Sequence, residues 1–322
     1  MRVGIVGTGT IARKMAMTIS KMEDAVLHAI ASRSVEKALT FAKEFSVERA
    51  YGSYDALMKD ALVDLVYIAT PHSHHFEIMV AALQHGKHVL CEKSFTVNEK
   101  QAETAIHIAS KEKLLLAEAI WTRYLPMRES LESVLGTGII GEVKGITANL
   151  GFAMSHVARL AEPSLAGGAL LDVGVYTINF ALMANKKEIK NIHSAAVFTN
   201  KGLDEQSNIT LEFIDGSLAM LHSSQVSATD RRGLIFGTKG YIEVRNIVNP
   251  EWIRVFDPFH TQLFEIIRPP QVSGFEYQLR SCKRMIEKGL IECPEMPHAE
   301  ILRVMHIMDT VRAQWNMKYP ME

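Results

Sequence analysis

The feature that most constrains the fold is a glycine-containing turn near the start of the chain. It reads Gly7-Thr8-Gly9-Thr10-Ile11-Ala12, directly after the apolar run Arg2–Val6. Glycine at position 7 permits a tight turn, glycine at position 9 lets the backbone approach a pyrophosphate, and Ala12 permits close helix–strand packing. The helix N-terminus that follows offers free N–H groups to an anion. The alternative is an ordinary strand–helix turn.

The first 120 residues repeat this strand–helix alternation. Continuous apolar strands separated by helices indicate a parallel sheet covered on both faces, and the crossover rule makes it a doubly wound, Rossmann-type sheet. The predicted strands are Arg2–Val6, Val26–Ala31, Val63–Ala69, Lys87–Cys91 and Leu114–Ala117, and the predicted helices are Ile11–Lys21, Val35–Phe45, His74–Gly86 and Asn98–Lys111.

The pattern changes after residue 120, which predicts a second domain. Strand-like runs follow one another closely, several joined by tight turns such as Asp215-Gly216 and Lys239-Gly240, so a mostly antiparallel sheet covered by helices is expected. We therefore predict a Rossmann domain over residues 1–120 and a substrate and dimerisation domain over 121–322, whose last helix can pack back on the first domain. The predicted helices here are Pro126–Leu135, Gly167–Ala184, Phe275–Lys288 and Ala299–Trp315.

Composition excludes several function classes. The chain has 322 residues, 48% of them hydrophobic and 22% charged, as in globular proteins, and its net charge of −1 argues against nucleic-acid binding. Its three cysteines lack metal-ligand spacing, so we expect free thiols and no metal. Without a secretion signal we expect a cytoplasmic protein. The apolar stretch Ala166–Ala184 resembles a membrane span, but Asp172 at its middle favours a buried helix.

The end of the second predicted strand indicates which nicotinamide cofactor is preferred. An acidic residue at this position binds the ribose hydroxyls of NAD, but here the chain reads Ser32-Arg33. A guanidinium flanked by hydroxyls suits the 2′-phosphate of NADP, and Lys37 lies one helical turn further on. NADP is therefore the predicted cofactor, with NAD as the alternative. Arg33 and Lys37 could equally be solvated surface residues.

Asp172 and Tyr176 are the two ionisable residues of an otherwise apolar segment, Gly167–Tyr176. On a helix, residues four apart share a face, so the two side chains would project together. A buried polar group needs a partner. Taken alone, the pair could be structural, with a core tyrosine whose hydroxyl is satisfied and a locally paired aspartate.

Four motifs lie in order along the chain: Gly7–Ala12, Ala69–His75, Gly86–Lys93 and Gly167–Tyr176. Together they resemble the glucose–fructose oxidoreductase/inositol dehydrogenase/rhizopine-catabolism (Gfo/Idh/MocA) family over almost the full chain. Within that family, Glu118–Pro126 and the last of these motifs resemble the dimeric dihydrodiol dehydrogenases and the NADP-dependent xylose dehydrogenases. Two positions depart from the common family pattern: Ser94 replaces the usual proline, and Tyr176 stands where many members have histidine.

The resemblance implies hydride transfer between the nicotinamide of NADP(H) and a CH–OH group of a sugar or vicinal diol. A proton must leave or join the hydroxyl as the hydride moves, and Tyr176 is the expected carrier. An adjacent ammonium favours a phenolate, so Lys93 would assist Tyr176, while Asp172 would orient Lys93 or accept a substrate hydroxyl. The predicted cofactor-binding residues are Gly7, Thr8, Gly9, Thr10, Ile11, Ala12, Ser32, Arg33, Lys37, Thr70, Pro71, His72, His75, Glu92, Lys93, Trp121 and Arg123.

Other expectations concern the substrate pocket, the assembly and competing functions. Phe152, His156 and Arg159 precede the catalytic helix and are predicted substrate-pocket residues. The apolar strand Leu218–His222 predicts a sheet face that a partner covers, and hence a homodimer or dimer of dimers, with no nucleic-acid or membrane partner. Two alternatives stay open: a catalytically silent cofactor-binding regulator, and an imine or tetrapyrrole reductase of the same fold.

Overall fold

The structure is a computed structural model that describes residues 1–154 and 156–322. The chain divides into two compact units, which we describe separately. Unit 1 consists of Met1–Tyr124 and Gln271–Met305, and unit 2 of Leu125–Pro270 and His306–Glu322. The segment Gln271–Met305 therefore belongs with the N-terminal part of the chain.

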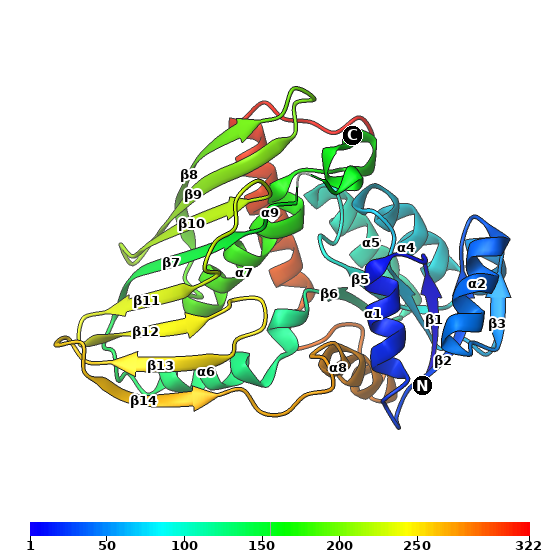
Figure 1. Cartoon of the computed structure of the whole chain (residues 1–322), viewed down its shortest axis with the longest axis horizontal. Helices are drawn as coiled ribbons and strands as arrows, with labels where there is room; N and C mark the ends of the chain where they lie inside the picture. Colours follow the sequence, from blue (N-terminus) through cyan, green and yellow to red (C-terminus); the bar gives the residue numbers. More distant parts are fainter. Residues whose placement is uncertain (155) are drawn as a thin grey trace. The chain divides into compact units, whose positions relative to one another are not determined.

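Unit 1 contains a six-stranded parallel sheet (Figure 1). The order of strands is β3-β2-β1-β4-β5-β6. The chain adds strands to one side of β1 and then, from β4 on, to its other side; doubly wound folds bind their ligands at this switch point. The predicted doubly wound sheet is thereby confirmed. The strands are β1 (Arg2–Val6), β2 (Val26–Ala31), β3 (Arg49–Tyr51), β4 (Leu65–Ile68), β5 (His88–Glu92) and β6 (Leu116–Ala119).

Three helices of unit 1, α2, α3 and α5, begin at polar side-chain caps, and α1 follows Gly9. Ser34, Ser53 and Asn98 each accept a hydrogen bond from a backbone N–H three residues later, which satisfies one free donor of the helix start. The short elements β3 and α3 were not among the predicted elements. The helices are α1 (Thr10–Ile19), α2 (Val35–Phe45), α3 (Tyr54–Met58), α4 (His75–Gln84), α5 (Glu99–Glu112) and α8 (Glu276–Glu287).

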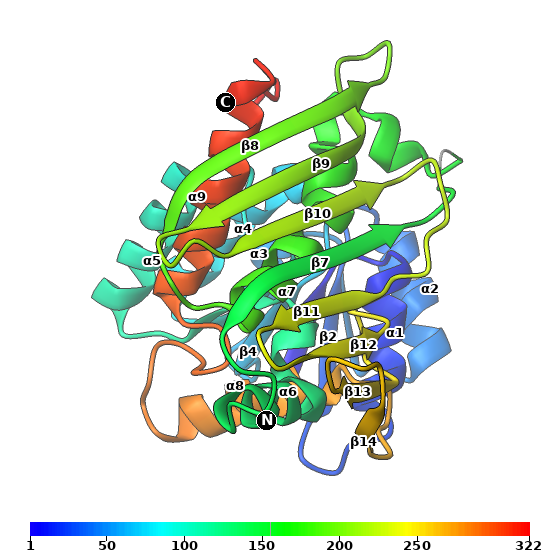
Figure 2. The same cartoon turned by 90° about the vertical axis from the view of Figure 1, so that its left-hand side faces the viewer.

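Unit 2 contains an eight-stranded sheet, seen face-on in Figure 2. The order is β14-β13-β12-β11-β7-β10-β9-β8, and only the pair β7 and β10 is parallel, so the predicted mostly antiparallel sheet is confirmed. The strands are β7 (Val143–Gly151), β8 (Ile189–Phe198), β9 (Asp204–Phe213), β10 (Leu218–Ser224), β11 (Gly233–Gly237), β12 (Gly240–Arg245), β13 (Trp252–Phe256) and β14 (Gln262–Ile267).

Helices cover one face of this sheet. Helix α6 (Pro126–Gly136) contacts β13, and α7 (Val175–Ala184) contacts β7 and β10. The predicted continuous α-helix over 167–184 is wrong in one respect, because Leu170–Gly174 winds as a π-helix before α7 begins. π-Helical turns are rare and occur frequently at functional sites. Helix α9 (His298–Gln314) crosses from one unit to the other.

One described segment, Pro163–Ala184, is long and apolar enough to cross a membrane by length and composition. In the structure 89% of its most apolar window is buried inside the protein. It therefore has the surroundings of a core helix, and it carries Asp172 and Tyr176 into the interior of unit 2.

Candidate active site

Gly7 occupies a position in unit 1 that only glycine can take. Its φ is +107°, which residues with a side chain rarely adopt, and a Cβ placed there would lie 2.7 Å from the carbonyl oxygen of Ala69. Its N–H donates to the carbonyl of Ala31 at 2.9 Å. The turn after β1 is thus held against the ends of β2 and β4, at the carboxyl edge of the sheet.

The start of α1 is open and uncapped. No side chain caps Gly9, and the first turn of the helix contains no acidic residue. A Cβ placed on Gly9 would meet nothing within 4 Å among the described residues. Because the first N–H groups of a helix lack intrahelical partners, this open position suits an anion such as the pyrophosphate of a dinucleotide.

The end of β2 presents two cationic side chains. Arg33 and Lys37 are exposed, whereas Ser32 is buried and its hydroxyl accepts the N–H of Ser34 at 3.3 Å. Arg33 also forms a hydrogen bond with Tyr54; burial raises the pKa of that phenol, and the guanidinium opposes the rise. Two exposed cations beside the start of α2 fit a phosphate monoester.

The loop after β4 and the loop after β5 are joined by His75. Its ring is fully buried, with Nε2 2.9 Å from the carbonyl of Thr70 and Nδ1 2.9 Å from that of Ser94. Burial lowers the pKa of His75 to about 4, and hydrogen bonds to the backbone oppose the decrease. His72 is buried against His75, their ring centroids 5.7 Å apart.

Thr70 carries an unsatisfied polar atom at the same edge of the sheet. Its Oγ1 is buried and has no hydrogen-bond partner among the described residues. A buried hydroxyl without a partner costs free energy, so a ligand that bonds to it is favoured. Together with the open start of α1, this hydroxyl indicates that the residues present fit a bound dinucleotide.

Lys93 follows β5 directly and lies half-buried next to buried Glu92. Glu92 accepts a hydrogen bond from the hydroxyl of fully buried Tyr67, and this bond holds the carboxylate in place. The peptide bond between Lys93 and Ser94 is cis. The lysine is thus placed at the carboxyl edge, as the sequence predicted from the end of an apolar strand.

Glu118 is a second buried carboxyl group in this region, and no catalytic role was predicted for it. Burial raises the pKa of Glu118 to about 7, although the charge of Arg123 opposes the rise. One carboxyl oxygen accepts the N–H of Phe95 at 3.2 Å, and the other has no hydrogen-bond partner among the described residues. No pattern in the sequence marks a glutamate at the end of a strand as buried.

Trp121 and Arg123 follow β6 and both have protein partners. Trp121 stacks on Phe275, with ring centroids 4.4 Å apart and an angle of 18° between the rings. Arg123 is buried, and its guanidinium donates to Glu300 of α9 at 3.0 Å. Their predicted contacts with the nicotinamide or the substrate stay predictions.

In unit 2 the structure pairs Asp172 with Arg159. The guanidinium of Arg159 donates to Oδ1 of Asp172 at 3.0 Å; the carboxylate is buried and the arginine is 45% exposed at its side chain. Tyr176 lies one turn later and is half-buried. Two predicted site residues, one from the substrate pocket and one from the catalytic set, are thus in direct contact.

Phe152 and His156 flank the same loop. Phe152 is half-buried, with the guanidinium of Arg231 5.8 Å from its ring centre, and His156 is exposed. Arg231 was not predicted, because only the fold brings residue 231 to residue 152. Among the described residues no group of three histidine, cysteine or acidic side chains could hold a metal ion.

The sheet order, the uncapped start of α1 and the unsatisfied hydroxyl of Thr70 fit the class of dinucleotide-binding proteins with a Rossmann-type domain. The chain belongs to the GFO/IDH/MocA oxidoreductase family, whose NAD-binding Rossmann domain matches residues 1–119 and whose C-terminal domain matches residues 129–243. The predicted family is thereby confirmed. The protein is an NAD(P)-dependent dehydrogenase that acts on CH–OH groups.

Named relatives cover essentially the whole chain. It is 34% identical to a trans-1,2-dihydrobenzene-1,2-diol dehydrogenase of Xenopus laevis, over 98% of both chains, and 31% identical to that of Homo sapiens, over 100% of this chain and 99% of the other. Among solved structures, a 3-ketoreductase from Actinomadura kijaniata in complex with NADP and TDP-benzene superposes with a TM-score of 0.87 at 25% identity, over 97% of each chain.

Proposed function

We propose that this dehydrogenase uses NADP(H) to oxidise a CH–OH group of a vicinal diol or a sugar, or to run the reverse reduction. Tyr176 carries the proton, assisted by Lys93 and Asp172. The observation that carries the proposal is the ion pair between buried Asp172 and Arg159, one helical turn before half-buried Tyr176. The names of the relatives support the diol as a substrate class.

The bound nicotinamide supplies the hydride acceptor or donor. The residues of this chain have the remaining tasks. The open start of α1 binds the pyrophosphate and the hydroxyl of Thr70 contacts the cofactor. Tyr176 takes the hydroxyl proton as the alcohol becomes a carbonyl, a role that needs a neighbouring cation to favour the phenolate. Lys93 is the cation we assign, and Asp172 orients it or accepts a second substrate hydroxyl.

Tyr176→Phe tests the proton carrier. General acid–base groups contribute about 10²- to 10⁴-fold, so we expect kcat to fall by at least about 10²-fold while the dissociation constant of NADPH stays unchanged. The substrate is the best one from a screen of diols, pentoses and hexoses. Tyr241→Phe is the matched control, because the Tyr241 hydroxyl forms a hydrogen bond with an exposed histidine, His260, at 3.4 Å, far along the chain from the proposed site residues. Near-normal turnover of Tyr176→Phe would show that the assignment is wrong.

The preference for NADP is assigned to Arg33, with Lys37 beside it. Both cations are exposed at the start of α2, where a 2′-phosphate would gain from them. Arg33→Ala should lower kcat/KM with NADP by about 10- to 100-fold and leave kcat/KM with NAD unchanged. Lys43→Ala, in the last turn of the same helix, is the control. A wild-type enzyme that uses NAD as well as NADP contradicts the proposal.

We also propose a homodimer or dimer of dimers through the sheet of unit 2. Along β10, Leu218 and Met220 are 43% and 52% exposed, whereas the alternating residues Ala219 and Leu221 are buried. An apolar outer sheet face favours a partner. Sedimentation at micromolar concentration should give at least twice the chain mass, and Met220→Glu should lower it. A wild-type monomer would exclude this assembly. The cytoplasmic location expected from the sequence is likewise a proposal.

A further inference from the structure

The turn Gly167–Gly168 in unit 2 is so closely packed that a Cβ atom on either glycine would collide with other atoms of the protein. Gly168 has a φ of +104°, and a Cβ there would lie 2.3 Å from Oδ1 of Asp204. A Cβ on Gly167 would lie 2.4 Å from the carbonyl oxygen of Leu160. This turn leads directly into the segment that carries Asp172 and Tyr176.

Asp204 holds the helical side of this turn. It is the first residue of β9, it is fully buried, and its Oδ2 accepts the N–H of Leu170 at 2.6 Å. Helix starts present N–H groups without intrahelical partners, and a carboxylate there is favoured. Burial raises the pKa of Asp204 to about 7, and in either protonation state one oxygen can still accept this N–H.

Tyr319 holds the other side of the turn. Its hydroxyl donates to the carbonyl of Gly167 at 2.9 Å, and the side chain is only 3% exposed. Its own backbone N–H donates to the carboxylate of Glu322 at 2.8 Å. The guanidinium of Arg312 lies 5.1 Å from the centre of the Tyr319 ring. Tyr319 is therefore fixed at its backbone and its ring as well as at its hydroxyl.

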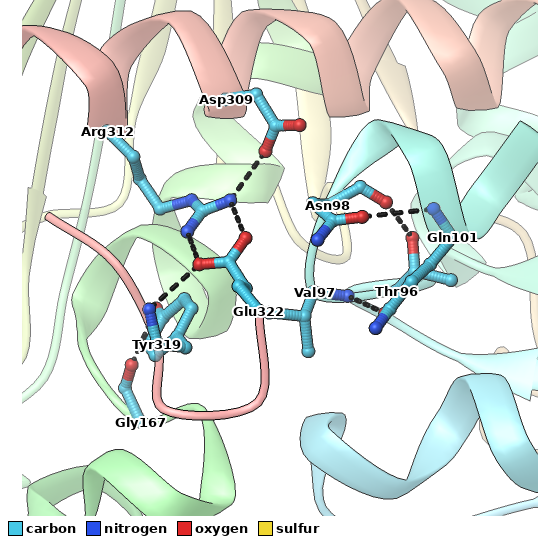
Figure 3. Close-up of polar contacts among 9 residues, drawn as sticks. All are labelled: Thr96, Val97, Asn98, Gln101, Gly167, Asp309, Arg312, Tyr319 and Glu322. Atoms are coloured by element: carbon cyan, nitrogen blue, oxygen red, sulfur yellow. Dashed lines mark hydrogen bonds and ion pairs between the residues drawn. The ribbon is translucent and has the colours of Figure 1, made fainter.

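Arg312 connects Tyr319 to α9 (Figure 3). Its two terminal nitrogens donate to both carboxylate oxygens of Glu322, at 2.6 and 2.9 Å, and one of them also donates to Asp309 at 2.7 Å. A bidentate arginine–carboxylate pair is geometrically specific. A buried ion pair often adds little to stability, because desolvation offsets the attraction. The network instead fixes the position of Tyr319, whose hydroxyl bonds to the carbonyl of Gly167.

We propose that Asp204 and Tyr319 are positioning residues for hydride transfer. Asp204 holds the N–H of Leu170, Tyr319 holds the carbonyl of Gly167, and together they fix the turn from which the segment with Asp172 and Tyr176 starts. Asp204 is fully buried and Tyr319 is 3% exposed, so we assign both residues to the support of the turn and not to substrate binding. The inference rests on the proposed role of Tyr176, because a fixed turn matters for turnover only if that segment takes part in the chemistry.

Tyr319→Phe removes one hydroxyl and leaves the ring. Misplacement of a reacting group by about 1 Å can cost about 100-fold, so we expect kcat to fall by about 5- to 50-fold. The KM values for NADP and for the alcohol should stay within about twofold, since ground-state binding does not need this geometry. Backbone amides of residues 169–176 should exchange hydrogen faster, while those of 178–184 keep their protection. Tyr241→Phe, in the same unit, should change none of these quantities.

Asp204 is tested by a conservative pair of variants. Asp204→Asn keeps the size and an acceptor oxygen for Leu170, so it should retain kcat within about threefold. Asp204→Ala removes the acceptor and should reproduce the loss seen in Tyr319→Phe. Should either Tyr319→Phe or Asp204→Ala not fold, Glu322→Gln weakens the same network from its outer end and should lower kcat and amide protection in the same direction by a few-fold.

Tyr176→Phe, measured in parallel, separates the two proposals. If Tyr176→Phe loses turnover but Tyr319→Phe, Asp204→Ala and Glu322→Gln keep wild-type kcat and amide protection, the positioning inference is overturned and the proposed function stands. If Tyr176→Phe keeps turnover, the proposed function fails. In that case faster exchange at residues 169–176 in Tyr319→Phe would still support the structural half of the inference, and unchanged exchange would overturn it as well.

Discussion

Two helical segments in this chain begin just after glycines, but one start is open and the other is closed by a side chain of the protein. In unit 1, α1 follows Gly7 and Gly9 with no side-chain cap, no acidic residue in its first turn and open space at the Gly9 Cβ position. In unit 2, the segment after Gly167 and Gly168 has the carboxylate of Asp204 on the N–H of Leu170. The first start has no side-chain acceptor, and the second has a carboxyl oxygen of the protein itself.

The difference shows how the same backbone chemistry serves binding in one place and positioning in another. A helix start has unsatisfied N–H groups wherever it occurs. Left open at the carboxyl edge of a parallel sheet, these groups can bind a phosphate. Where a buried carboxyl oxygen accepts one of these N–H groups, as at Leu170, that group is satisfied by the protein and the segment that follows is held at its start. In both places a glycine with positive φ lies against the protein's own atoms, Gly7 against the carbonyl oxygen of Ala69 and Gly168 against Oδ1 of Asp204.

Gly168→Ala should have the largest effect, because it adds a methyl group where Asp204 already lies. Backbone strain at φ +104° and displacement of the carboxylate together should lower the free energy of unfolding of unit 2 by at least about 3 kcal/mol. Chemical denaturation followed by a probe in unit 2 measures it. Gly202→Ala is the control, since φ is +75° there and a Cβ would meet nothing within 4 Å among the described residues. Equal losses in the two variants would mean that Asp204 does not crowd the turn.

Asp204 should also give unit 2 a pH dependence that the open start of α1 lacks. Its pKa is raised by burial to about 7, against 3.8 for an ordinary aspartate, despite the nearby charge of Arg312. Because the pKa of Asp204 is higher in the folded than in the unfolded protein, the protonated group contributes fully to stability below pH 3.8. This contribution is lost as the pH rises through 7. Between pH 5 and 8, wild type should therefore lose about 2–3 kcal/mol of unfolding free energy relative to Asp204→Asn. A constant difference across that range would place the pKa of Asp204 near its ordinary value.

The same comparison shows how far sequence patterns reach. The turn Gly7–Ala12 is local, with its glycines, strand and helix within 20 residues, so the sequence alone indicated its geometry. The partner of Leu170 is 34 residues away in β9, and the partner of Gly167 is 152 residues away at Tyr319. No spacing rule connects such residues, because only the assembled fold brings them together.

Sequence patterns did not predict strand β3 or the π-helical turn, for similar reasons. Strand β3 has three residues, Arg49–Tyr51, too few to show an apolar period, and it exists as a strand only through its pairing with β2. The π-helical turn Leu170–Gly174 has the same apolar composition as the α-helix that follows it. Among the site residues, Asp172 and Tyr176 stood out as polar positions in an apolar run, whereas the contact of Asp172 with Arg159 depends on how the loop before it folds.

Gly9→Ala should have the smallest effect on the fold and a clear effect on binding. Gly9 has a φ of −77°, which alanine adopts readily, and its Cβ would enter open space. Alanine is a poorer N-cap than glycine, but it also lowers the entropy of the unfolded chain; because these two effects oppose each other, the melting temperature should change little. The added methyl would occupy the space through which the pyrophosphate approaches the backbone, so the dissociation constant of NADPH should rise by about tenfold or more, or about 1.4 kcal/mol. Gly136→Ala, where a Cβ likewise meets nothing within 4 Å among the described residues, is the control for both measurements.

Wild-type affinity in Gly9→Ala would mean that the open start of α1 is not where the phosphates lie. The contrast with the self-capped segment of unit 2 would then lose its functional meaning.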